Sequence, residues 1–232
     1  MKLVPKADPE ALAETFRRAE PFPHVVIDGL FEDSVLDDIL RRFPAESSSA
    51  WERFDNPRER KLGNLTGLRE FDATVEAFLC AMSAPGVLGF LERLTGIEGL
   101  IPDPYFAGGG LHQIERGGFL DVHADFNWHP ALKLDRRLNL LVYLNRDWRE
   151  EYGGHLELWD GRLSGPVRRI LPEFNRTVIF ATTDRSFHGH PRPLACPEGR
   201  ARRSLSFYYY TNGRPESERS DPHDTLFPPA AR

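Results

Sequence analysis

The sequence contains little cysteine, little lysine and no long apolar run. Its two cysteines, Cys80 and Cys196, lie far apart, which argues against a disulfide framework or a zinc site made of thiolate pairs. No run approaches the roughly 18 apolar residues of a membrane span, and the opening MKLVPKADPEALAETF lacks the apolar segment of a signal peptide. We therefore expect a soluble, cytoplasmic protein that does not bind membranes.

The overall charge is mildly acidic. The chain has 30 Lys and Arg against 35 Asp and Glu, which gives a formal net charge of −5, and lysine occurs at four positions alone, 2, 6, 61 and 133. Such a charge provides no general attraction to nucleic acid. With 232 residues and 40% hydrophobic content, the chain is long enough for one well-packed domain.

The first hundred residues favour helices. Asp8 followed by Pro9 is a typical helix start, and Val35, Leu36 and Ile39 are spaced as one helical face. Helices are predicted over 8–20, 32–43 and 74–97, the last interrupted at Pro85-Gly86. Residues 23–31 are predicted as a short strand and turn, and residues 44–64, which show no period, as a surface loop.

From about residue 105 the pattern changes to short strands separated by Gly, Pro, Asn and Asp. Strands are predicted over 111–116, 119–124, 138–144, 154–159, 167–171, 176–182, 186–190 and 203–211. Short strands at this spacing favour a sandwich or closed roll over an alternating β-α-β sheet. We therefore predict a single domain, 1–232, made of a helical region (1–100), a β core (105–211) and a polar, Pro-rich tail (212–232) without fixed structure.

The strand FLDVHADFNWHP suggests a metal site. His123 and Asp125 are two positions apart, so a strand presents both side chains on one face, and His188 in SFHGHPRPL supplies a second imidazole. Two imidazoles and one carboxylate that leave coordination positions open form the ligand set of non-haem Fe(II) oxygenases. The His-x-Asp pair alone is a weak signal, because two solvated groups on a surface strand give the same pattern.

A later strand offers an anchor for a second acid. In RARRSLSFYYYT, Arg202 and Ser204 share one strand face, whereas Arg203, Leu205 and Phe207 share the other. The apolar face should pack under the helices, so Arg202 should point into a pocket, where a guanidinium binds a carboxylate through two hydrogen bonds. Arg203 takes this role if the register is shifted by one residue.

These segments resemble the Fe(II)/2-oxoglutarate-dependent dioxygenases, specifically their prolyl 4-hydroxylase-like branch. The resemblance covers 111–211 and rests on HAD (123–125), RRLNLLVYLNRDW (136–148), GGHLELWD (153–160), FNRTVIF (174–180), SFHGHPRPL (186–194) and RRSLSFYYYT (202–211). It implies a mainly β fold with flanking helices (α+β): a double-stranded β-helix, or cupin-like jelly-roll, on which the N-terminal helical region packs.

The resemblance also assigns roles to individual residues. It implies that His123, Asp125 and His188 bind Fe(II) as the catalytic centre. It implies that the distal carboxylate of 2-oxoglutarate lies beside Arg202 and Tyr143, although an aromatic residue within LLVYL is also a common core residue. The full set implied at the cosubstrate is Arg202, Tyr143, Ser204 and, by a weaker match, Gln113.

The reaction implied is the hydroxylation of a C–H bond by dioxygen, with conversion of 2-oxoglutarate to succinate and CO₂ and with ascorbate as a further stimulant. The substrate is either a protein side chain, such as a prolyl residue, or a small molecule. Halogenation is disfavoured because Asp125 retains the carboxylate that related halogenases replace by a small residue. Two other classes stay open: a non-catalytic cupin-like binding module and a zinc hydrolase, neither of which needs an anchor for a second acid.

The remaining histidines are weaker candidates. His190 should face the same way as His188, next to a metal ligand or the substrate, unless it is a structural histidine bonded to a loop carbonyl. One of Asn127, Trp128 and His129 is a candidate for substrate contact, and so is the segment WERFDNPRER (51–60). His155 can point in either direction, and we predict structural or surface roles for His24, His112 and His223.

Overall fold

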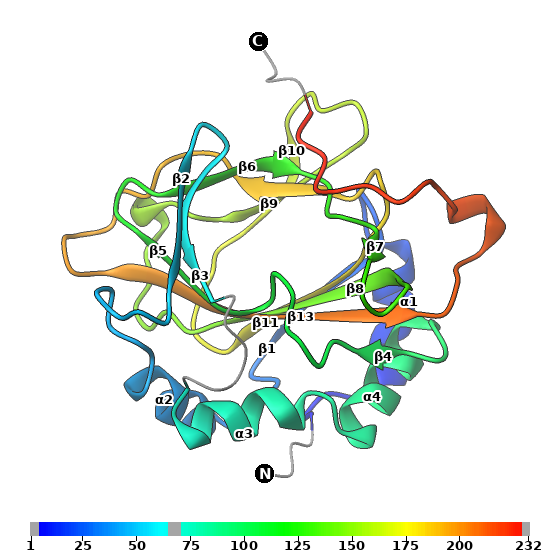
Figure 1. Cartoon of the computed structure of the whole chain (residues 1–232), viewed down its shortest axis with the longest axis horizontal. Helices are drawn as coiled ribbons and strands as arrows, with labels where there is room; N and C mark the ends of the chain where they lie inside the picture. Colours follow the sequence, from blue (N-terminus) through cyan, green and yellow to red (C-terminus); the bar gives the residue numbers. More distant parts are fainter. Residues whose placement is uncertain (1–4, 65–70, 229–232) are drawn as a thin grey trace.

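The computed structural model describes residues 5–64 and 71–228 as a curled β sheet with helices on one side (Figure 1). Four α-helices precede most of the strands: α1 (Pro9–Arg18), α2 (Asp33–Arg41), α3 (Ala73–Ala81) and α4 (Pro85–Thr95). Two short 3₁₀ turns, η2 (Glu150–Tyr152) and η3 (Glu216–Glu218), follow later in the chain. This agrees with the predicted order of a helical region and then a β core.

The helices begin and end where the local chemistry requires. Asp8 caps α1 by accepting a hydrogen bond from the backbone N–H of Glu10, and Asp72 caps α3 in the same way through Thr74. Pro85 does not interrupt a helix but begins α4. At this position the missing N–H of proline costs nothing, because the first N–H groups of a helix have no partner within it. Gly96 ends α4 in the left-handed conformation, with φ of 72°.

The sheet contains all the strands of the described chain. They are β1 (His24–Asp28), β2 (Glu52–Asn56), β3 (Glu59–Gly63), β4 (Ile101–Pro102), β5 (Gly110–Glu115), β6 (Phe119–His123), β7 (Trp128–His129), β8 (Leu134–Tyr143), β9 (Leu156–Trp159), β10 (Pro166–Ile170), β11 (Arg176–Ala181), β12 (Phe187–His190) and β13 (Ala201–Thr211). Their order is β1-β11-β8-β13-β5-β3-β6-β12-β9-β10, with β2 beside β3, β4 beside β13 and β7 beside β8. Neighbours are antiparallel, and strands far apart in sequence lie together.

The two faces of β8 and β13 have different roles. Leu140 and Phe207, one from each strand, pack with Phe78 of α3 and Phe90 of α4 in the main hydrophobic core. The side chains at the alternate positions of both strands face a cavity on the other side of the sheet. The helices α2, α3 and α4 lie below this part of the sheet in Figure 1. The core thus fixes which residues of β13 face the cavity.

The prediction of a surface loop over 44–64 is wrong for the second half of this segment. Residues 52–63 form the hairpin β2–β3, and β3 pairs with both β5 and β6. Its turn is stabilised by Asn56, whose side-chain oxygen accepts hydrogen bonds from the N–H groups of Arg58 and Glu59. The strand pattern was hidden because β2 is mostly exposed and carries charged residues.

The prediction that the tail lacks fixed structure is also wrong for residues 212–228, while 229–232 lie outside the described residues. Leu226 forms two backbone hydrogen bonds with Ala124, of 2.8 and 2.9 Å. Asn127 donates to Ser220 Oγ and to the carbonyl oxygen of Asp221. Because polar contacts hold this segment, its composition gave no sign that it is ordered.

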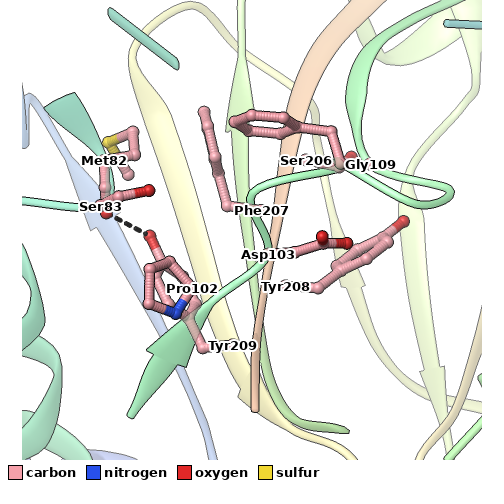
Figure 2. Close-up of a pocket in the computed structure, with 10 residues that line it drawn as sticks. Met82, Ser83, Pro102, Asp103, Gly109, Ser206, Phe207, Tyr208 and Tyr209 are labelled. Carbon is pink, nitrogen blue, oxygen red and sulfur yellow. Dashed lines mark hydrogen bonds between the residues drawn. The ribbon is translucent and has the colours of Figure 1, made fainter. Parts of the chain in front are cut away.

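A small hollow lies between the end of α3 and the helix side of β13 (Figure 2). Its wall includes Met82, Phe207 and Tyr209, and the Tyr209 hydroxyl donates to the Met82 carbonyl oxygen over 3.1 Å. Its volume of about 10 Å³ leaves space for about one water molecule, so it is not a ligand site.

No single helix in the described parts of the chain is long and apolar enough to cross a membrane. Taken together, α3 and α4 have the length and composition of a membrane span, but the helix axis bends by 45° between them. The large apolar side chains of this pair, including Phe78, Leu79 and Leu91, are buried in the core described above.

Candidate metal centre

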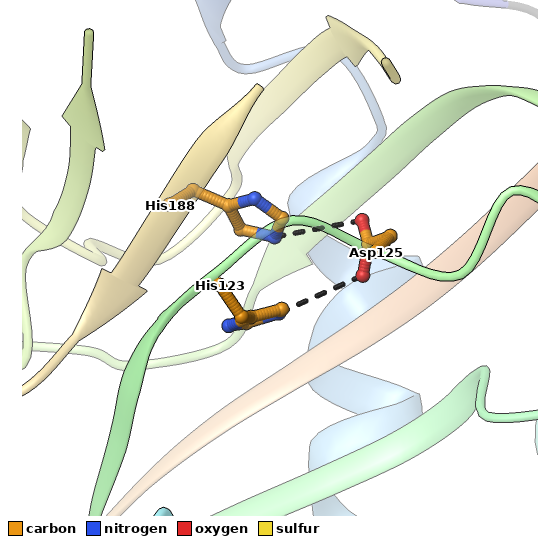
Figure 3. Close-up of side chains that lie close together, drawn as sticks. All are labelled: His123, Asp125 and His188. Carbon is orange, nitrogen blue, oxygen red and sulfur yellow. Dashed lines mark ion pairs between the residues drawn. The ribbon is translucent and has the colours of Figure 1, made fainter. Parts of the chain in front are cut away.

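His123, Asp125 and His188 lie together at one end of the cavity (Figure 3). His123 ends β6 and pairs directly with His188 on the antiparallel strand β12. Nε2 of His123 is 3.6 Å from Oδ1 of Asp125, and Nε2 of His188 is 3.6 Å from Oδ2. One ligand atom of each residue lies within 4.8 Å of the others, so one cation can contact all three.

The backbone orients both imidazoles in the same way. Nδ1 of His123 is 2.8 Å from the carbonyl oxygen of Asp121, and Nδ1 of His188 is 3.0 Å from that of Ser186. A carbonyl accepts hydrogen bonds only, so Nδ1 carries the proton and Nε2 keeps its lone pair for a metal. Burial lowers the pKa of His188 to about 4 despite the opposing effect of Asp125, which keeps this imidazole neutral.

Two buried side chains of β8 hold Asp125 in place. Asn139 donates from Nδ2 to Asp125 Oδ2 over 2.8 Å, and the Arg136 guanidinium lies 3.2 Å from the same oxygen. Burial raises the pKa of Asp125, but the charge of Arg136, together with the interactions of the two neighbouring imidazoles, outweighs burial and holds the pKa well below its usual value. The carboxylate is therefore ionised and fixed in orientation, as a metal ligand must be.

Arg136 is itself locked in position. It is 1% exposed, donates through Nε and an NH₂ group to Asn139 Oδ1, and lies between the rings of Phe126 and Tyr208, at 4.4 and 3.5 Å. The sequence did not reveal this role, because Arg136 and Tyr143 have opposite parity along β8. A register shift near Arg136 brings both to the cavity. Asn139 lies four residues before Tyr143 on β8 and therefore shares its strand face, so the alternation of side chains along the strand could have predicted that Asn139 faces the cavity.

The cavity extends from His123, Asp125 and His188 to a buried arginine. Its volume is about 390 Å³, and Arg202, Tyr143 and Ser204 line it. Arg202 is 5% exposed and donates to the carbonyl oxygen of Gly154 over 2.8 Å and to the Tyr143 hydroxyl over 3.2 Å. Among the described residues no carboxylate forms an ion pair with Arg202. A buried guanidinium in this state favours an anion in the cavity.

Tyr143 has the protonation state that such an anion requires. The side chain is fully buried, and burial raises the pKa of its hydroxyl although Arg202 acts against this. The hydroxyl therefore keeps its proton at neutral pH and can donate it to a carboxylate. Burial also lowers the pKa of Arg202, which is the electrostatic consequence of a buried cation without an anion.

The expected position of Gln113 at the cosubstrate is not what the structure shows. On β5, His112 and Ile114 face the cavity, whereas Gln113 lies on the opposite face and accepts a hydrogen bond from Arg203 Nε over 2.8 Å. Arg203 is placed over the ring of Phe43, away from the cavity. The alternation along β5 and β13 accounts for both placements. Arg202, and not Arg203, is therefore the arginine of the cavity.

The other histidines fall into two groups. His190 and His112 line the cavity, so the prediction of a structural or surface role for His112 misplaced it. His155 is hydrogen-bonded to Glu150 over 2.7 Å and lies outside the cavity. Asn127, Trp128 and His129 do not line it either, and the same is true of His24 and His223.

Two segments that the sequence left undefined complete the wall. Phe54 and Glu59 come from the β2–β3 hairpin, in the stretch 51–60 expected near the substrate, and Lys61 follows them. Thr225 and Phe227 come from the tail, and the Phe227 ring lies 5.6 Å from the ring of His123. The cavity is thus bordered by chain segments outside the β core.

Comparison with known proteins gives one family. Residues 109–210 match the model described as the 2OG-Fe(II) oxygenase superfamily, where 2OG is 2-oxoglutarate. No curated protein matches the sequence. The matched segment contains His123, Asp125, His188, Tyr143 and Arg202.

Solved structures share the fold over most of the chain. A Pseudomonas putida prolyl-4-hydroxylase has a TM-score of 0.63 at 14% identity, covering 89% of this chain and 100% of its own. A Trichoplax adhaerens prolyl hydroxylase, in complex with a hypoxia inducible factor peptide fragment, has 0.63 at 18%, covering 87% and 90%. Streptomyces hygroscopicus HygX, with nickel, 2-oxoglutarate and hygromycin B bound, has 0.54 at 12%, covering 88% and 92%.

The curled sheet and the His-Asp-His cluster define a class, the non-haem metal enzymes built on a double-stranded β-helix. The family match makes this more specific: the β core belongs to the 2OG-Fe(II) oxygenase superfamily. The match over this segment indicates a hydroxylating dioxygenase that depends on Fe(II), 2-oxoglutarate and O₂. The donor set fits the metal, because two imidazoles and one carboxylate are the ligands that Fe(II) takes in such sites.

Proposed function

We propose that His123, Asp125 and His188 hold Fe(II), and that Arg202 and Tyr143 bind the distal carboxylate of 2-oxoglutarate. The observation that carries this proposal is a buried arginine without a carboxylate partner in the same cavity as a His-Asp-His cluster. A metal-binding module has no need of such an arginine, whereas an oxygenase with a dicarboxylate cosubstrate does.

When bound, the iron and 2-oxoglutarate supply the activation of dioxygen that hydroxylation of a C–H bond requires. The protein's own residues position the reactants. The hydrogen bonds at Nδ1 direct both imidazole Nε2 atoms toward the cation, and Asn139 fixes the carboxylate of Asp125. Arg202 and the Tyr143 hydroxyl set the orientation of the cosubstrate along the cavity.

The substrate in this proposal is a C–H bond of a protein side chain or of a small molecule that enters beside the β2–β3 hairpin and the tail. Phe54 and Phe227 provide apolar surface on that side, and Glu59 and Lys61 provide charge. Related folds accommodate both classes, since one structure holds a peptide fragment and another holds hygromycin B. The cytoplasmic location stays a prediction.

Formation of succinate tests the proposal without knowledge of the substrate. Purified protein with Fe(II), 2-oxoglutarate and O₂ should release succinate slowly even without a substrate. Asp125→Ala and His188→Ala should abolish this release, because each removes one of three metal ligands, while the unfolding transition stays cooperative. A folded Asp125→Ala variant that forms succinate at the wild-type rate would refute the assignment.

A further inference from the structure

His190 is a buried polar side chain that lacks a partner. It lies on β12, two residues after His188, and is 4% exposed. Within residues 5–64 and 71–228, neither of its ring nitrogens forms a hydrogen bond. Native proteins almost always satisfy buried nitrogen atoms of this kind, so an imidazole with both atoms unpaired at a cavity wall indicates a ligand.

The strand register separates His190 from the metal site along β12. His188 pairs with His123 across β12 and β6, and after a shift in register His190 pairs with Leu120 further along the same two strands. Two residues of β-strand correspond to about 6.6 Å, comparable with the reach of a five-carbon dicarboxylate bound to a metal at one end. The separation of His190 from the metal site therefore matches the length of 2-oxoglutarate.

The cavity also contains two cationic side chains. Arg202 and Lys61 line the same cavity as His190. Lys61 is paired with Glu59 over 2.8 Å, whereas Arg202 has no acidic partner among the described residues. An imidazole with free ring nitrogens in the same cavity as an unpaired guanidinium can donate one N–H to an anion that the guanidinium holds.

We propose that His190 donates a hydrogen bond to the distal carboxylate of 2-oxoglutarate, as a third group beside Arg202 and Tyr143. This inference rests on the proposed function, because it requires the distal carboxylate to lie at Arg202. It adds a residue from the β6–β12 side of the cavity to a site otherwise formed by β8 and β13. The carboxylate is then held from both sides of the cavity.

The test compares two ligands on the Mn(II)-loaded protein without oxygen, by titration calorimetry. 2-Oxoglutarate has the distal carboxylate, and 2-oxopentanoate has the same chain length but ends in a methyl group. His190→Leu should weaken the binding of 2-oxoglutarate about 10-fold, the effect of one hydrogen bond to a charged group, and should leave the binding of 2-oxopentanoate nearly unchanged. His24→Leu is the matched control, because His24 is also buried with an unpaired Nε2 but lies outside the cavity.

The outcomes distinguish a failure of this inference from a failure of the proposed function. If His190→Leu weakens the binding of both ligands equally, or of neither, the proposed role of His190 is wrong. Binding of 2-oxoglutarate by the wild type still supports the proposed function in that case. Absence of 2-oxoglutarate binding to the wild type overturns both. If His190→Leu does not fold, His190→Phe serves as the apolar variant. His190→Gln, which keeps a donor, should bind 2-oxoglutarate more tightly than either, and equal binding counts against the proposal.

Discussion

Replacement of Asn139 by leucine tests whether Asp125 must be held from behind to bind the metal. Asn139 is 2% exposed and links two charged groups: its Nδ2 donates to Asp125 Oδ2 over 2.8 Å, and its Oδ1 accepts from Arg136 over 2.8 and 3.0 Å. Leucine has a similar volume but no polar atoms. The variant therefore removes one hydrogen bond to the carboxylate and two hydrogen bonds from a buried guanidinium without creating a large cavity.

The magnitudes follow from these contacts. Loss of a partner that orients a metal ligand reduces metal affinity about 10- to 100-fold. Loss of the acceptor of the buried Arg136 should lower the free energy of unfolding by at least roughly 1–3 kcal/mol, which is the cost of leaving a buried polar group without its partner. The two effects are separable, since metal affinity is measured on the folded protein and stability by denaturant without metal.

The assay is titration of the metal-free protein with Mn(II), which replaces Fe(II) without oxidation. Asn145→Leu is the matched control: Asn145 is 5% exposed, and its side chain donates to the Pro172 carbonyl oxygen over 2.7 Å, away from the three ligands. This control should lose stability and keep its metal affinity. If a folded Asn139→Leu variant binds Mn(II) within about threefold of the wild type, Asp125 does not need this support and the reasoning is refuted.

Three further predictions concern the cosubstrate, the tail and the core. Arg202→Met should raise the 2-oxoglutarate concentration needed for succinate formation far more than the Fe(II) concentration, whereas Arg203→Met should change neither; the reverse result would contradict the observed register. Phe227→Ala should speed the loss of metal to a chelator, measured by absorbance, because Phe227 packs 5.6 Å from His123; an unchanged rate would show that the tail does not shield the site. Leu205→Ala should lower the free energy of unfolding by about 2–5 kcal/mol in denaturant titrations, since Leu205 is fully buried; a loss below about 1 kcal/mol would contradict its place in the core.

The sequence predicted the His-Asp-His cluster because two of its three members are close along the chain. His123 is the last residue of β6 and Asp125 follows two positions later, so the two side chains lie near each other although Asp125 is outside the strand. His188 required the family resemblance, since nothing in the spacing shows that β12 pairs with β6. The alternation along β13 also predicted that Arg202 points away from the helices, because Leu205 and Phe207 must be buried.

What the sequence did not predict depends on contacts between distant segments. Gln113 was placed by analogy, although its strand neighbours show that it shares a face with Arg203 through the pairing of β5 and β13. The hairpin β2–β3 and the tail carry mainly charged or polar residues, and they are ordered by backbone pairing with the β core, which leaves no hydrophobic pattern.

The same distinction explains why the reaction is easier to infer than the substrate. The groups proposed to bind the iron and 2-oxoglutarate come mostly from strands of the β core, in which the alternation of side chains can be recognised in the sequence. The groups on the substrate side, including Phe54, Glu59 and Phe227, come from the hairpin and the tail, which the sequence left undefined. Segments of this kind change without disturbing the core, so the substrate must be read from these side chains and not from the fold.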